Sequence, residues 1–104
     1  MNRVVIALLI ANGLSQVTAA EWCEGGNLHK ATMAVWSKAE YANRLATASD
    51  FTAKVLKPKS MAELRKKAGD LEACLSSAAA KRKDEKASDV AALCAVILWS
   101  DELK

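Results

Sequence analysis

The chain has 104 residues and a formal net charge of +3 at pH 7, from 15 basic and 12 acidic side chains. This length allows one domain, and charges of both signs are interspersed, so no field is strong enough to indicate a nucleic-acid-binding protein. We expect one small domain with no nucleic-acid partner.

The first twenty residues have the pattern of a cleavable signal peptide. A short start containing Arg3 precedes an apolar run over residues 4–11, and small residues lead up to Ala20. The alternative, a membrane anchor or a first core helix, is disfavoured because polar residues interrupt the run well short of the roughly 20 needed to span a bilayer. The pattern predicts a signal peptide over residues 1–20, a single domain over residues 21–104, and a periplasmic or secreted protein.

A helical pattern begins at Leu28. Two glycines just before it disfavour helix, and Asn27 is available as an N-cap. Small and apolar residues then recur at spacings of three and four. Two interpretations stay open: one helix over residues 28–57, or two helices separated by a break near Ser49.

Pro58 ends this pattern because proline has no amide donor. Ser60-Met61-Ala62-Glu63 then matches a capping box, in which the Ser60 and Glu63 side chains each accept from the other residue's amide. Apolar residues repeat at intervals of three and four after it, which is typical of a seam that packs against other helices. The predicted seam residues are Met61, Leu64, Ala68, Leu71, Leu75 and Ala78.

The most apolar ten residues after the leader, Val90–Trp99, predict a buried helix that extends to about Asp101. Ser88 and Asp89 precede the run and are able to cap its first turn. The run is too short for a membrane span. Its predicted inner face consists of Val90, Leu93, Cys94, Ile97 and Leu98. The opposite face includes Val96 and Trp99, and it is either covered by the first helix or marks an interface.

No stretch shows strand alternation, so the predicted fold is all-α, an antiparallel bundle of three to four helices stapled by a disulfide. Cys74 and Cys94 each lie about seven residues from the tip of a helical hairpin at residues 81–87, so they reach the same level and are the predicted pair. The alternative pair, Cys23 with Cys74, requires the first helix to bend. An unpaired Cys23 is able to link two chains, which leaves a homodimer open.

Few residues suit catalysis or metal binding. His29 is the only histidine, so paired-histidine zinc sites have no support, and no signature of a thiol protease surrounds it or Cys23. His29 and Met33 have the spacing of one helix face and are weak candidates for a soft metal. There is no C-x-x-C motif for redox chemistry or haem attachment. We therefore predict no catalytic residues and no cofactor.

Three tryptophans are many for a chain of this length. Tryptophan is enriched at the energetic centres of protein interfaces. Trp22, in the irregular segment over residues 21–27, is the first candidate for partner contact. The other candidates are Trp36, Val96 and Trp99. The alternative for each tryptophan is packing within its own bundle.

The sequence has a leader, Trp22-Cys23 near the mature start, a helical body and the later Cys74. In this outline it resembles the small periplasmic acid-stress chaperones. It is also similar to the small disulfide-bonded helical immunity proteins that neutralise toxins in the periplasm. The third cysteine and the net positive charge of the chain are departures from the chaperone pattern. No functional residue is carried over from either family.

These features predict a non-enzymatic exported protein that binds another envelope or secreted protein, such as an inhibitor, immunity factor or accessory subunit. One alternative is a periplasmic stress chaperone that exposes its apolar seams when partly unfolded. Another is a carrier of a small ligand or metal, with its pocket near His29 and Met33.

Overall fold

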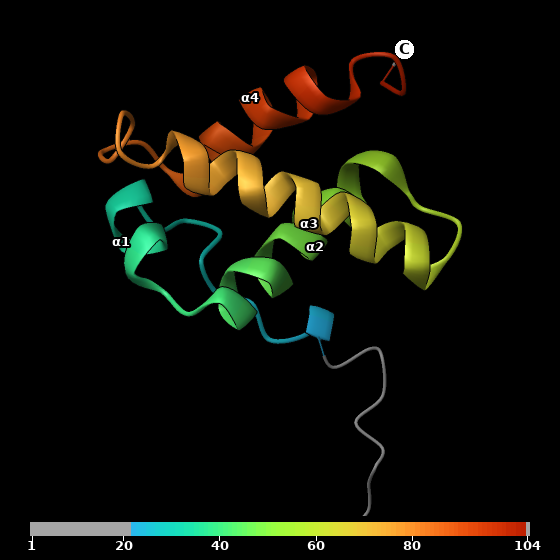
Figure 1. The fold of residues 1–104 in the computed structure, drawn as a ribbon, viewed down its shortest axis with the longest axis horizontal. Coiled ribbons are helices and arrows are strands. Elements are labelled where there is room, and N and C mark those ends of the chain that lie inside the picture. Colours follow the sequence, from blue (N-terminus) through green and yellow to red (C-terminus); the bar gives the residue numbers. More distant parts are fainter. Residues whose placement is uncertain (1–21, 104) are drawn as a thin grey trace, which may run out of the picture.

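The structure, a computed structural model, describes residues 22–103. Its α-helices in this part of the chain are α1 (Met33–Lys38), α2 (Tyr41–Leu56), α3 (Met61–Ala78) and α4 (Ala87–Trp99). α3 contacts each of the other three helices (Figure 1). The only β-type pairing among these residues is an isolated bridge between Thr32 and Lys86. The prediction of an all-α fold is confirmed, and the predicted signal peptide over residues 1–20 lies outside the described residues.

The helix is interrupted at Ala39 and Glu40. The prediction of one helix over residues 28–57 is therefore wrong, and so is the alternative of a break near Ser49. Ala39 and Glu40 are extended, whereas α2 continues through Ser49, whose hydroxyl donates to the Ala46 carbonyl at 2.7 Å. The Arg44 guanidinium donates to the Ala39 carbonyl at the end of α1. A side chain from α2 therefore replaces the hydrogen bond that a continuous helix would have made.

Asn27 is not an N-cap, because α1 begins later and is capped by Thr32, whose hydroxyl accepts from the Val35 amide at 3.3 Å. Asn27 pairs instead with Asn43 on α2: its amide donates to Asn43 Oδ1 at 3.0 Å, and its Oδ1 accepts from Asn43 Nδ2 at 2.8 Å. The next amide, of Leu28, donates to the Thr47 hydroxyl at 3.2 Å. Residues 22–29 thus lie along α2 as an irregular segment, which we call the strap.

The capping box before α3 is shifted by one residue on one side. Ser60 Oγ accepts from the Glu63 amide at 3.0 Å as predicted, but the Glu63 carboxylate accepts from the Lys59 amide at 2.9 Å. The predicted seam of α3 supplies three fully buried residues, Ala68, Leu71 and Leu75. Met61 is exposed because it lies in the first turn, next to the exposed end of the preceding loop.

Buried polar groups connect α1 and α2 to α3. The indole Nε1 of Trp36 donates to Ser76 Oγ at 3.1 Å, and that hydroxyl donates to Glu72 Oε2 at 2.8 Å. The same carboxylate oxygen accepts from Arg44 Nε at 2.9 Å. Trp36 is fully buried, so it packs within its own bundle.

The predicted disulfide between Cys74 and Cys94 is present, with the two Cα atoms 6.0 Å apart, and the alternative pairing of Cys23 with Cys74 is wrong. It joins α3 to α4 across a sequence separation of 20 residues. Closing a loop of this size stabilises the folded state by about 3 kcal/mol in the loop-entropy model. Cys74 and Cys94 reach the same level because α3 and α4 run antiparallel (Figure 1).

The inner face of α4 differs from the prediction. Val90 and Cys94 are buried, but Leu93, Ile97 and Leu98 are exposed. The buried residues of α4 are instead Ala87, Val90, Ala91, Cys94, Ala95 and Trp99. Because this helix is apolar on every side, the disulfide selects which side faces inward, and the small residues beside Cys94 follow it.

The start of α4 also differs from the prediction. It begins at Ala87, whose amide donates to the Ala31 carbonyl at 2.7 Å, and its N-cap residue Lys86 makes no capping bond through its side chain. Ser88 and Asp89 therefore lie inside the first turn. None of the helices between residues 22 and 103 has the length and apolar character to cross a membrane.

Two glycines provide a matched test of this packing. A Cβ atom at Gly26 would lie 2.4 Å from the backbone nitrogen of Thr47, whereas a Cβ atom at Gly69 would meet nothing within 4 Å. We expect Gly26→Ala to lower the free energy of unfolding by about 1–3 kcal/mol through overpacking. Gly69→Ala, within α3, should raise it by about 1 kcal/mol through helix propensity. Urea denaturation followed by circular dichroism measures both, and equal effects would contradict the close approach of the strap to α2.

Candidate docking surface

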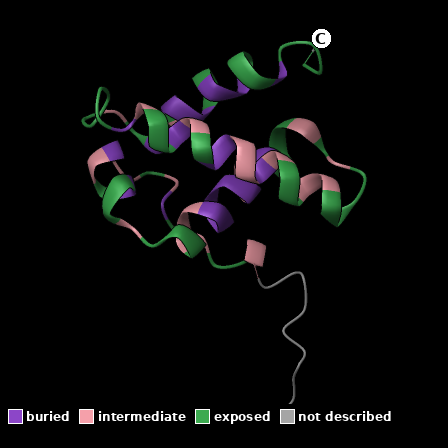
Figure 2. Ribbon diagram, viewed as in Figure 1, coloured by how far each residue is buried: buried purple, intermediate pink, exposed green. Residues whose placement is uncertain are grey.

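The outer side of α4 carries a continuous apolar strip. Ile97 is 74% exposed, Val96 59% and Leu93 44%, and Ala92 beside them is also exposed. We call these four residues the α4 strip. Exposed and buried residues alternate along α4 in Figure 2. Large aliphatic side chains that lie together in water are unusual on a monomer and are typical of a docking surface.

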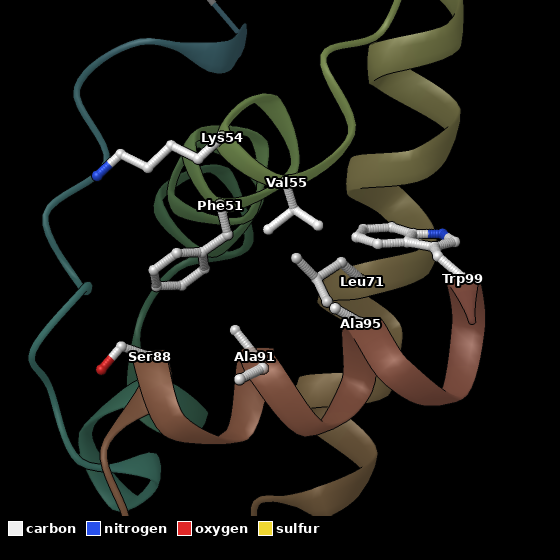
Figure 3. Close-up of a pocket in the computed structure, with 9 residues that line it drawn as sticks. Phe51, Lys54, Val55, Leu71, Ser88, Ala91, Ala95 and Trp99 are labelled. Carbon is white, nitrogen blue, oxygen red and sulfur yellow. The ribbon is translucent and has the colours of Figure 1, made fainter. Parts of the chain in front are cut away.

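A cavity of about 140 Å³ lies between α2 and α4, next to this strip. We call it the α2–α4 groove. Its lining residues are Phe51, Lys54, Val55, Leu71, Ser88, Ala91, Ala92, Ala95 and Trp99. Figure 3 shows Phe51, Val55 and Leu71 around a common space whose floor is α4. The space exists because alanines form the α4 wall where larger side chains would have reached α2.

The strip and the groove form one surface because Ala92 belongs to both. Val96 follows Ala92 by four residues, so the two lie on the same side of the helix. Lys54 lies on the rim from α2 with its ammonium directed outward (Figure 3), and the exposed Asp89 precedes the strip on α4. Beyond the end of α4, Glu102 pairs with Lys67 of α3 at 2.7 Å. The surface is therefore an apolar area with charged side chains around its edges.

The four predicted partner-contact residues are divided by the structure. Val96 is exposed on the strip, and Trp99 is buried with its ring against the groove. Trp36 belongs to the core. Trp22 is half-buried, with the Arg65 guanidinium 5.0 Å from its ring centroid. The structure thus brings Val96 and Trp99 to one surface and places Trp22 and Trp36 elsewhere.

His29 and Met33 do not form the predicted pair on one helix face, because His29 precedes α1 and Met33 is fully buried in the core. His29 Nε2 lies 2.8 Å from Asp50 Oδ2, and its ring meets Phe51 edge-on at 5.4 Å. Among residues 22–103, no group of three or more histidine, cysteine or carboxylate side chains is arranged to hold a metal ion. The histidine serves here to attach the strap to α2.

Cys23 is half-buried beside α2, where its carbonyl accepts from the Ser49 hydroxyl at 3.1 Å. Burial raises the pKa of the Cys23 thiol, and the neighbouring Glu24 carboxylate raises this pKa further. A raised pKa lowers the fraction of reactive thiolate at neutral pH. This shift disfavours the thiolate that a nucleophilic site would need.

The α2 side of the groove was not predicted from the sequence, and the prediction that Leu93 and Ile97 lie inside is wrong. Phe51 and Val55 continue the helical spacing of α2, so their position on one face was visible in the sequence. That this face meets α4 was not visible, because it depends on how both helices pack on α3. The predicted disulfide could have indicated which side of α4 faces inward, because Ala91 and Ala95 lie beside Cys94 on the helix.

Comparisons with models of known protein families, with curated proteins and with solved structures find no match to this chain. The apolar surface over α4 and the α2–α4 groove is thus the observation on which a functional assignment depends.

Proposed function

We propose that this chain is an exported protein that acts by binding another protein, without catalysis, through the α4 strip and the adjoining groove. Inhibitors, immunity factors and accessory subunits act in this way. The observation that carries the proposal is the exposure of Leu93, Val96 and Ile97 side by side on one helix.

The energetics favour a protein partner. Removing apolar surface from water contributes about 25 cal/mol per Å², so three adjacent aliphatic side chains supply a substantial driving force when a partner covers them. The groove offers a concave site beside the buried ring of Trp99, and interface hot spots concentrate in such well-packed pockets. The charged rims lie outside the apolar centre, which is the arrangement typical of interfaces.

Two features support export. The leader pattern over residues 1–20 predicts it, and the disulfide between Cys74 and Cys94 suits an oxidising compartment such as the periplasm or the extracellular space.

Replacement of Ile97 tests the proposal. Ile97→Glu introduces a charge at the most exposed position of the strip, so we expect affinity for a captured partner to fall by about 30-fold or more. The matched control is Val35→Glu, since Val35 on α1 is 52% exposed but lies outside the strip and the groove. Capture from an envelope extract by the disulfide-bonded protein, followed by titration of the captured protein, measures the change. Equal retention by both variants would contradict the proposal.

A second candidate function, transport of a small apolar molecule, is favoured by the groove itself. This site replaces the predicted pocket near His29 and Met33, which the structure does not form. A dry apolar cavity of roughly 150 Å³ is large enough to bind benzene. The groove, at about 140 Å³, has a comparable volume.

Ligand-dependent thermal unfolding tests this candidate. Saturating toluene should raise the Tm of the protein, because a ligand that binds only the folded state stabilises it. Ala92→Leu places a larger side chain at the exposed edge of the groove and should abolish the rise, whereas Ala62→Leu on the exposed first turn of α3 should retain it. An unchanged Tm of the unmodified protein would contradict the carrier function.

A further inference from the structure

We propose that the α2–α4 groove binds a small carboxylate, with its apolar body inside the groove and its carboxylate group at the end where Lys54 and Ser88 lie. This inference rests on the carrier function proposed for the groove, since it names the class of ligand at the same site. Of the α4 strip, only Ala92 lines the groove.

The walls of the groove determine the body of the ligand. Seven of the nine lining residues are apolar, and two of them, Leu71 and Trp99, are buried in the core. The volume of about 140 Å³ is close to the roughly 150 Å³ that holds one benzene ring in a dry apolar cavity. A single ring or a short branched chain therefore fits, whereas a long acyl chain does not.

The two polar lining residues lie at one end of the groove. Ser88 is in the first turn of α4 and Trp99 is its last residue, so about 16 Å of helix separates them. Figure 3 shows Lys54 and Ser88 on either side of the Phe51 ring, with Trp99 at the opposite end. A ligand with a polar group at one end of an apolar body matches this arrangement.

The charge at the polar end is positive. Lys54 is the only charged residue among the nine that line the groove, and it makes no ion pair with any described residue. Asp50, one turn before it on α2, is paired with His29 at 2.8 Å. Asp89 is exposed and does not line the groove. An ammonium without a carboxylate partner favours an anionic group over a neutral or cationic one.

The carboxylate of the ligand would stay at the mouth of the groove. The Lys54 ammonium is directed outward (Figure 3), and its flexible four-carbon stem allows it to meet a carboxylate there. The Ser88 hydroxyl makes no hydrogen bond with a described residue, so it is able to donate to the same group. A carboxylate in this position keeps contact with water, which limits the cost of binding a charge.

An NMR titration of the disulfide-bonded protein tests the sign of the charge. The probes are 4-methylbenzoate and 4-methylbenzylamine, which share a methylated ring and differ in the charge of the second substituent. The unmodified protein should bind 4-methylbenzoate about fivefold more tightly than the amine, as expected for an ion pair at a surface. Equal affinities, or a preference for the amine, would overturn the inference.

Substitution of Lys54 tests the position of the carboxylate. Lys54→Glu should reverse the order of the two affinities, and Lys54→Gln should lower the affinity for 4-methylbenzoate about threefold. The matched control is Lys38→Glu, because Lys38 is exposed on α1 outside the groove, and it should leave both affinities within about twofold. If both Lys54 variants bind 4-methylbenzoate as tightly as the unmodified protein does, the carboxylate lies elsewhere and the inference is wrong.

Failure of the inference is distinguishable from failure of the carrier function. If toluene raises the Tm but 4-methylbenzoate binds no better than the amine, the groove holds a neutral apolar molecule and only the inference fails. If neither toluene nor 4-methylbenzoate binds, the inference and the carrier function both fail. Binding of a protein through the α4 strip is tested separately by Ile97→Glu.

Discussion

The arrangement of the helices depends on the buried carboxylate of Glu72. It accepts from Arg44 on α2 and from Ser76, whose hydroxyl in turn accepts from the buried indole of Trp36 on α1. Removing one partner of such a buried pair is strongly destabilising, because the remaining charge is left without compensation. Arg44 also donates to the Ala39 carbonyl, so the side chain that pairs with α3 also separates α1 from α2.

This network holds α1 and α2 against α3, and the disulfide from Cys74 holds α4 against α3 as well. Cys94 turns the small side chains of α4 inward, where Ala91 and Ala95 face the groove. The large aliphatic side chains of the same helix are consequently directed outward. The apolar surface is therefore a consequence of how α4 is attached, and its position follows from a covalent constraint.

The sequence predicted the features that depend on local spacing. The α-helical class, the seam of α3 and the pairing of Cys74 with Cys94 follow from intervals of three and four residues and from the symmetry of a hairpin. The break at Ala39 was not predictable, because a distant carboxylate fixes the arginine that causes it. The face of α4 was not predictable from periodicity, because a helix that is apolar on every side has no preferred face.

We expect the α4 strip to be exposed in the free protein and covered in a complex. Methyl-labelled protein, with a soluble paramagnetic probe, tests this most directly through the relaxation of Leu93, Val96 and Ile97. We expect strong relaxation of these methyl groups in the free protein and protection when a captured partner is bound, while the methyl groups of Val35 relax equally in both. Protection of the strip in the free protein would contradict its exposure, since the strip would then belong to the core, and strong relaxation in the bound protein would show that the partner does not cover it.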